Sequence, residues 1–323
     1  MAVFVAAKDA GESAEWVNVN VIVAEAGAGK DATAPTVEDA RNWLLERDLL
    51  PEQQSGGAIS DDRVLRRFTA LSKCAFGDAV GEDARRKFLQ RLIPCEDRLA
   101  AKQTDIGAVT DPKYHYELRL RNEAPIKAKP MRLRPEEEAW LDVHLDELLA
   151  KGVIGPILPH EQPRCVTPLL LVPGQQSGQA YRVCQNIVPV NKRTDEYQYQ
   201  LNDTRRYRAK LGRAAWVSMI DLKAGFHNII FETKSSYDST FITHRGKYRW
   251  LRMPMGLTQA PAHFQFVVED VLRGEQEERE LPVVVYLDDI AVYGEDEAQV
   301  LEDTLEAIRR LTGAGFMINL KKS

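Results

Sequence analysis

Two adjacent aspartates, Asp288 and Asp289, constrain the fold more than any other feature of the sequence. They separate two apolar runs rich in β-branched residues, residues 283–287 and 290–293. Such runs predict two strands that are joined by a tight turn at the acids. Because each run is short and almost wholly apolar, the strands are expected to be buried on both faces.

Ionised carboxylates at the end of a buried hairpin repel each other and lose hydration, so they need a positively charged partner. No Lys or Arg lies between residues 280 and 293. A divalent cation is the other solution, because hard oxygen ligands suit Mg²⁺. Aspartate is also a common turn residue, so an isolated Asp-Asp turn is more often structural than metal-binding.

A third carboxylate, Asp221, also follows an apolar strand pattern, residues 215–220. It is far from the aspartate pair in sequence. Three carboxylates that are brought together on adjacent strands would hold two divalent ions. One acid at a strand end is unremarkable, whereas the combination favours a metal site.

Length and composition limit the classes of protein to consider. A chain of 323 residues allows about two domains, and 44% hydrophobic residues supply a core. The four cysteines show no Cys-x-x-Cys spacing, so neither a zinc ribbon nor a disulfide framework is expected. This cysteine usage favours a reducing, intracellular compartment. No secretion signal or apolar stretch of membrane-spanning length is present, so no membrane partner is expected.

The net charge of −5 argues against a nucleic-acid partner until its distribution is considered. Residues 1–62 contain 12 acidic and 4 basic residues, so the rest of the chain has a net charge of +3. Basic residues gather in residues 182–213. This enrichment fits contact with a phosphate backbone, and it fits a solvated basic surface equally well.

We expect three segments along the chain. Residues 1–62 read as an acidic, disordered leader with one short helix in residues 37–50, and residues 63–112 as a small helical or linker segment. Residues 113–323 show strand patterns at 114–120, 166–172, 181–184 and 215–220 and helix patterns at 135–149, from Pro261 and around 301–308. A glycine-rich stretch at residues 27–31 lacks the spacing of a phosphate-binding loop.

Three motifs then occur in a fixed order: Ser-Met-Ile-Asp-Leu-Lys-Ala-Gly-Phe-His at residues 218–227, Met-Pro-Met-Gly-Leu-Thr-Gln-Ala-Pro at 253–261 and Tyr-Leu-Asp-Asp at 286–289. In these motifs the sequence resembles the reverse transcriptase of long-terminal-repeat retrotransposons of the Ty3/gypsy type. The likeness extends from about His115 to the last residue. Residues 1–100 show no such likeness and would be the tail of an upstream polyprotein segment.

The resemblance implies an α+β fold, a right-hand polymerase with palm and fingers, in which helices cover a mostly antiparallel palm sheet and the thumb is absent. It implies an RNA-directed DNA polymerase that adds dNTPs to a primer paired with RNA or DNA. The family's catalytic acids match Asp221, Asp288 and Asp289. With the backbone carbonyl of Leu222 they would bind two Mg²⁺ ions, for which Mn²⁺ would substitute.

Four further site residues follow from the resemblance. Arg182 matches the fingers arginine that contacts the triphosphate, and Met255 lies where the family lines the nucleotide pocket. Phe226 matches the aromatic that blocks a ribose 2′-hydroxyl, although an ordinary core aromatic is the alternative. Lys322 matches a lysine that is suggested to act as general acid toward pyrophosphate.

The sequence also departs from the family pattern. The turn at residues 173–179 lacks the usual lysines, and Asn186 and Val188 replace an acid and a base. These changes, together with the expected lack of a thumb, leave a second interpretation: a catalytically silent, truncated retrotransposon relic that keeps the fold and nucleic-acid binding. In either case the expected partners are primer-template, dNTPs and other parts of a Pol polyprotein. The expected location is cytoplasmic, in virus-like particles, or nuclear.

Overall fold

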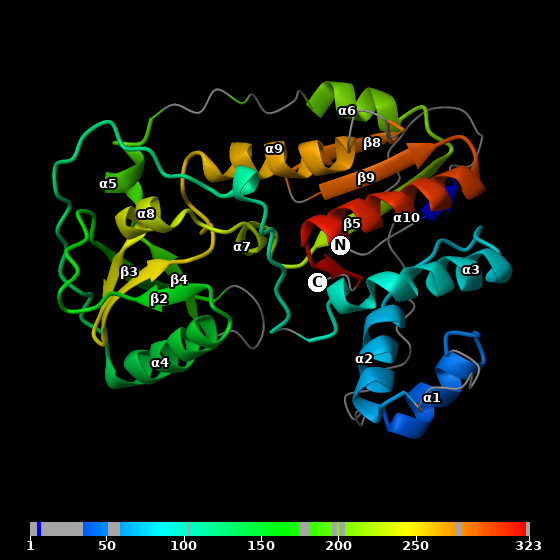
Figure 1. Ribbon diagram of the computed structural model, residues 1–323, viewed down its shortest axis with the longest axis horizontal. Coiled ribbons are helices and arrows are strands. Elements are labelled where there is room, and N and C mark those ends of the chain that lie inside the picture. The colour runs from blue at the N-terminus through cyan, green and yellow to red at the C-terminus, as the bar shows by residue number, and fades with distance from the viewer. Residues whose placement is uncertain are drawn as a thin grey trace. The chain divides into compact units, whose positions relative to one another are not determined.

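A computed structural model describes residues 5–7, 35–50, 59–102, 104–174, 181–195, 199, 204–274, 279–287 and 289–320. The chain divides into two compact units. Unit 1 comprises residues 1–105, 202–223 and 268–323, and unit 2 comprises residues 106–201 and 224–267. Figure 1 labels the helices and strands of both.

Unit 1 contains an antiparallel sheet in the order β1-β5-β9-β8. Its strands are β1 (Val5–Ala7), β5 (Trp216–Leu222), β8 (Val283–Tyr286), β9 (Asp289–Gly294) and β10 (Ile318–Asn319). Because β9 pairs along residues 216–221 of β5, the short strands β1 and β10 must share the opposite edge, at residues 216–218 and 221–222. The sheet is covered by the longest helix of the described chain, α10 (Glu297–Ala314).

The sequence of α10 explains both its ends and its buried face. Asp296 caps the first turn by accepting a hydrogen bond from the backbone N–H of Gln299, at 2.8 Å. Gly315, with φ of 104°, ends the helix in a left-handed conformation that suits glycine. Between these ends, Ile308 and Leu311 are fully buried, and the helix packs on β5 and β9. This packing leaves the opposite face of the sheet to carry polar side chains at the strand ends.

The remaining helices of unit 1 come largely from the N-terminal third of the chain. They are α1 (Val37–Leu45), α2 (Asp61–Leu71), α3 (Glu82–Leu92), the 3-10 helix η1 (Ile93–Arg98) and α6 (Thr204–Leu211). A buried carboxylate, Glu96 of η1, lies between two arginines of α2. The Nε atoms of Arg63 and Arg67 donate to its two oxygens at 2.6 and 2.5 Å, and Arg67 also donates to the carbonyl of Leu49 at 2.7 Å. These bonds tie α2 and η1 to each other and to the segment that follows α1.

Unit 2 contains a second sheet in the order β2-β7-β6-β3-β4, antiparallel except for the pair β3–β6. Its strands are β2 (Ile154–Pro156), β3 (Thr167–Pro173), β4 (Tyr181–Gln185), β6 (Phe241–Thr243) and β7 (Gly246–Trp250). Its helices are α4 (Pro135–Ala150), α5 (Val188–Asn191), α7 (Gly225–Asn228), α8 (Thr233–Ser236), η2 (Pro112–Tyr114) and η3 (Tyr237–Ser239). Helix α9 (Ala260–Arg273) begins in unit 2 and ends in unit 1.

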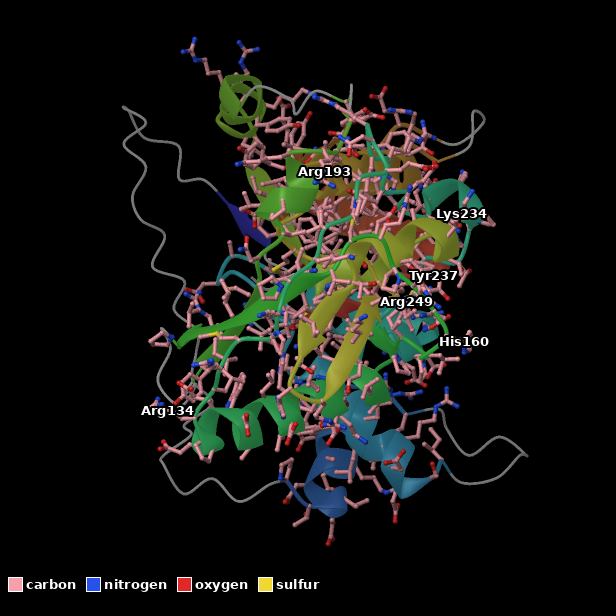
Figure 2. All side chains as sticks on the ribbon, turned by 90° about the vertical axis from the view of Figure 1, so that its left-hand side faces the viewer. Arg134, His160, Arg193, Lys234, Tyr237 and Arg249 are labelled. Carbon is pink, nitrogen blue, oxygen red and sulfur yellow. The ribbon has the colours of Figure 1, made fainter. Side chains whose placement is uncertain are left out.

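Polar contacts fasten the outer elements of unit 2 to its sheet. The guanidinium of Arg249 on β7 lies 4.2 Å above the ring of Tyr237, as the labels in Figure 2 allow the reader to follow. Arg249 also donates to the hydroxyl of Ser236 at 2.6 Å, and the Tyr237 hydroxyl donates to Glu161 at 2.6 Å. These contacts join η3 to β7 and to the loop that contains Glu161.

Most elements expected from the sequence are confirmed: the helices at 37, 135, 261 and 301, the hairpin of β3 and β4, and the strands around the aspartates. The strand predicted at residues 114–120 is wrong. Residues in it alternate between buried and exposed, but only Tyr116 and Leu120 form isolated bridges. The N–H of Leu118 bonds to the Ser235 hydroxyl at 3.1 Å instead of to a strand, so no ladder forms.

Two further expectations concern the N-terminal segment and the cysteines. Within residues 1–62, β1 and the start of α2 have regular structure besides the expected helix α1, whereas the rest of that segment lies largely outside the described residues. The division at residues 62 and 112 stays a prediction. All four cysteines are free thiols, so the expected lack of a disulfide framework is confirmed.

Candidate active site

Strand pairing brings two of the three predicted catalytic acids together. Asp221, near the end of β5, is the register partner of Asp289, the first residue of β9. Residues directly opposite in an antiparallel pair point to the same face, with Cβ atoms about 4.5–5.5 Å apart. Two carboxylates from segments far apart in the sequence therefore lie side by side at one end of the sheet of unit 1.

The hairpin that carries the aspartate pair is tightly closed. Tyr286 and Asp289 are register partners, and only two residues separate them in the sequence. Leu287 has φ of 54°, a left-handed conformation that costs an L-residue roughly 1–2 kcal/mol. Asp288 lies outside the described residues, as does Lys322. Their roles stay predictions.

A third polar side chain joins the two acids from the other edge of β5. Asn319 on β10 is the register partner of Asp221 on the side opposite β9. Its side-chain nitrogen Nδ2 donates a hydrogen bond to Oδ2 of Asp221 at 2.7 Å. Asn319, Asp221 and Asp289 thus form a row across three neighbouring strands.

The surroundings of Asp221 disfavour its ionised form. Burial raises the pKa of its carboxyl group, the hydrogen bond from Asn319 acts in the opposite direction, and the neighbouring charge of Asp289 raises the pKa further. Asp289 itself is exposed. A half-buried carboxylate beside a second carboxylate is a place where a bound cation relieves both desolvation and repulsion.

The donor set fits a divalent cation. Among the residues that the structure describes, no cluster of three or more His, Cys, Asp or Glu side chains forms, but Asp288 is not among those residues. Asp221 and Asp289 supply carboxylate oxygens, and the backbone of Leu222 follows Asp221 in the same strand. Oxygen donors of this kind suit Mg²⁺ or Mn²⁺ rather than metals that prefer sulfur or imidazole.

The predicted nucleotide-contacting residues lie in unit 2, whereas the aspartates lie in unit 1. Arg182 is exposed on β4, opposite Val172 of β3. Phe226 of α7 is half-buried, and its ring stacks on that of the buried Phe264, with centroids 4.9 Å apart. Phe226 is therefore packed against a core aromatic without being fully buried itself.

Met255 projects from a loop that one asparagine fastens. Its side chain is 67% exposed, the highest value among the large apolar side chains that are exposed in the described chain. Asn191, at the end of α5, donates to the carbonyl of Gly256 at 2.8 Å and accepts from the N–H of Thr258 at 3.1 Å. Sequence reasoning missed Asn191, because the loop it contacts is more than 60 residues away.

Asn191→Ala should loosen this loop without unfolding unit 2. A typical hydrogen bond contributes about 0.5–1.5 kcal/mol, so exchange of the Thr258 amide hydrogen should become roughly 2- to 10-fold faster. Hydrogen exchange followed by mass spectrometry of the peptide containing residues 251–259 measures this. The peptide of β7 serves as the internal control, and equal protection of residue 258 in both proteins would contradict the assignment.

The predicted basic stretch is divided between the two units. Lys192 and Arg193 lie just after α5 in unit 2, whereas Arg205, Lys210 and Arg213 lie on or after α6 in unit 1. Arg193 is used within its own unit, where it donates to the carbonyl of Ala124. The basic stretch in the sequence therefore does not by itself define one continuous phosphate-binding surface.

Comparison with known families agrees with this arrangement. Residues 178–323, which include the three aspartates, match the family described as reverse transcriptase (RNA-dependent DNA polymerase). The chain contains a reverse transcriptase domain. The retrovirus-related Pol polyprotein from transposon opus of Drosophila melanogaster is 33% identical over 212 residues, which are 64% of this chain and 20% of that protein. The Tf2-3 transposon polyprotein of Schizosaccharomyces pombe is 26% identical over 193 residues, 60% of this chain and 14% of that protein.

Solved structures show that the fold extends beyond the matched domain. The native protease-reverse transcriptase of prototype foamy virus has a TM-score of 0.66 at 22% identity and covers 86% of this chain and 35% of its own. The foamy viral protease-reverse transcriptase in complex with an RNA/DNA hybrid has the same TM-score at 19% identity, with 86% and 36% covered. The expected palm and fingers architecture and the resemblance to retrotransposon reverse transcriptases are confirmed.

This chain spans a fifth or less of the length of these two polyproteins. No helix in the described ranges has the length and apolar character needed to cross a membrane.

Proposed function

We propose that this chain is the palm and fingers part of a Pol polyprotein and acts as an RNA-directed DNA polymerase. It would add dNTPs to the 3′-hydroxyl of a primer paired with RNA or DNA. The observation that carries the proposal is the register of Asp221 and Asp289 within a reverse transcriptase domain. Adjacent carboxylates on neighbouring strands provide the charge that phosphoryl transfer with two divalent cations requires.

Each residue would have a separate task. Asp221, Asp288, Asp289 and the carbonyl of Leu222 would hold the cations. When bound, Mg²⁺ or Mn²⁺ would supply charge neutralisation at the triphosphate and favour the deprotonated primer hydroxyl.

The remaining residues would act on the nucleotide. Arg182 would donate charge-assisted hydrogen bonds to the triphosphate, as an exposed guanidinium on β4 permits. Phe226 and the exposed Met255 would line the sugar and base site, and Lys322 would give a proton to the departing pyrophosphate.

Primer extension with the purified full chain tests the proposal. The substrate is an oligo-dT primer on a poly(rA) template with dTTP and Mg²⁺ or Mn²⁺. We expect extension that requires the cation and stops when EDTA is added. A chain that binds the cation but gives no extension under either metal would contradict the proposal.

A second candidate is a non-catalytic relic that retains nucleic-acid binding. The substitutions at Asn186 and Val188, which leave no acid or base at these positions, favour it. Asn186 directly follows β4, and its N–H bonds to the carbonyl of Pro168 at 3.0 Å, whereas Val188 begins α5 and is 56% exposed. Because both charges of a pair would be lost together, neither is left unpaired, and the fold tolerates the change. Template binding without extension would support this candidate.

Phe226→Ala should relax the choice between dNTP and rNTP. Removing the ring removes the steric block, and an apolar site discriminates a hydroxyl by about 100-fold at most. The ratio of kcat/KM values for dUTP and UTP, which differ only at the 2′ position, should therefore fall by up to about 100-fold, with kcat/KM for dUTP changing much less. Steady-state single-nucleotide incorporation measures both.

Phe266→Ala is the matched control for this ratio. Phe266 is half-buried in the same unit and contacts the rings of Tyr199 and His263. It loses a similar apolar area, so its selectivity should stay at the wild-type value. If both variants shifted the ratio equally, Phe226 would be a packing residue and not a selectivity filter.

A primer-template duplex, dNTPs and other parts of a Pol polyprotein are the partners that this function requires. We place the chain inside the cell, in agreement with its four free cysteines.

A further inference from the structure

Asn319 is held in one position from three sides. The strand that carries it, β10, begins three residues after Gly315, the left-handed cap of α10. On one edge β10 pairs with β5, and the N–H of Lys223 donates to the carbonyl of Met317 at 2.8 Å. On the other edge, Leu99 forms a parallel bridge with Ile318.

The bridge is reinforced by hydrogen bonding and burial. The N–H of Ala100 donates to the carbonyl of Ile318 at 2.8 Å. Leu99 and Ile318 are both completely buried, and so are Phe316 and Leu320 on either side of the strand. The backbone of Asn319 therefore has little freedom, and the direction of its side chain is fixed by the register of β10.

From this fixed position the Asn319 amide contacts a carboxylate of the proposed cation site. Its Nδ2 donates to Oδ2 of Asp221 at 2.7 Å, a distance typical of a hydrogen bond to a charged acceptor. A neutral amide donor stabilises the ionised carboxylate without adding a positive charge that would repel a cation. A Lys or Arg at this position would compete with the cation for the same carboxylate.

We infer that Asn319 is a positioning residue: its amide holds the carboxylate of Asp221 in the orientation in which that carboxylate binds a divalent cation. The inference deepens the proposed function and rests on it for the role of Asp221. The inference also involves residues 99–100, which precede the matched domain. They support the site indirectly, because they pair with the outer edge of β10.

Asn319→Leu tests this inference, because leucine has a similar size and no donor. Residues that orient a metal ligand typically contribute 10–100-fold to metal affinity. We expect Mn²⁺ to bind at least about tenfold more weakly to the full-length variant, measured by electron paramagnetic resonance of free Mn²⁺ without nucleic acid or dNTP. Melting temperatures of both proteins are recorded in the same buffer, and Asn319→Ala replaces the leucine variant if that variant does not fold.

Ile318→Val is the matched structural control. It weakens packing in the same strand but leaves the amide of Asn319 in place. Its melting temperature should fall while its Mn²⁺ affinity stays within about twofold of wild type. Equal loss of affinity in the Asn319 and Ile318 variants would overturn the inference, because strand packing alone would then explain the effect.

The outcomes separate the inference from the proposed function. A wild-type chain that binds Mn²⁺ but does not extend a primer contradicts the polymerase proposal, and a weakened Asn319→Leu variant would still support the positioning role. Wild-type affinity in Asn319→Leu overturns the positioning role, whatever the result of primer extension.

Discussion

Asp221→Asn should abolish primer extension and at the same time raise the melting temperature of the metal-free protein. The variant keeps the shape of the side chain and an acceptor for the Asn319 amide, but it removes a carboxylate from the proposed cation site. Cations of this kind contribute several kcal/mol to the transition state, so extension should fall about 10³-fold or more. Single-turnover primer extension measures this loss.

The gain in stability has a separate cause. Asp221 is half-buried, and the charge of Asp289 lies opposite it on the next strand. Burial and the neighbouring carboxylate raise the pKa of Asp221, so the ionised form costs free energy in the folded state at neutral pH. A neutral amide avoids that cost. Stability is expected to be lower in the wild-type chain because the site is built for binding rather than for packing.

Asp303→Asn is the matched control, with the opposite expectation for both measurements. Asp303 is a completely buried aspartate of α10 in the same unit, where it forms an ion pair with Arg279. Neutralising it leaves Arg279 without that partner, so the melting temperature should fall while extension persists at temperatures where the protein is folded. An Asp221→Asn variant that melts below wild type, or extends primers at the wild-type rate, would contradict the assignment.

The sequence predicted the strands that carry Asp221 and Asp289 better than the residues that surround these two aspartates. Asp221 and Asp289 each follow or begin an apolar strand, and this pattern is visible in a short window. Their pairing depends on the register of β5 and β9, which joins residues about 70 positions apart. The three-motif resemblance supplied that link, because no local pattern specifies it.

The supporting residues could not be predicted for physical reasons. Asn319 lies on a strand of two residues, which is too short for any periodic signal. Its contact with Asp221 exists only because β10 occupies the edge of β5 next to β1. Residues 114–120 show the converse: Tyr116 and Leu118 are buried in an alternating pattern, but a side-chain hydroxyl of Ser235 takes the hydrogen bond that a strand would need.

Glu96→Gln should be the most destabilising single change in the N-terminal helices. The Glu96 side chain is 5% exposed and so is that of Arg67, while Arg63 covers it from the solvent side. Removing the charge from one member of a buried ion pair leaves the other uncompensated, at a cost of about 3–5 kcal/mol. Urea unfolding followed by circular dichroism measures the difference in free energy of unfolding.

Glu82→Gln in α3 is the matched control for that measurement. Its side chain is 90% exposed and pairs with Arg85 three residues later. An exposed pair contributes about 0–1 kcal/mol, so this variant should be close to wild type. Equal effects of the two substitutions would mean that the Glu96 cluster does not hold α2 and η1 together.

The contribution of Glu96 should also depend on pH in a defined direction. Burial by itself raises the pKa of Glu96, but the hydrogen bonds and charges of Arg67 and Arg63 outweigh burial and lower the pKa below its ordinary value. A carboxyl group with a lowered pKa in the folded state stabilises fully above its unfolded-state pKa, and this stabilisation is lost as the pH falls through the folded-state pKa. The difference in unfolding free energy between wild type and Glu96→Gln should therefore be constant from pH 8 to about pH 5.5 and shrink below about pH 4.5. If the difference in unfolding free energy grew on acidification, folding would raise the pKa of Glu96, and the two arginines would not stabilise its carboxylate.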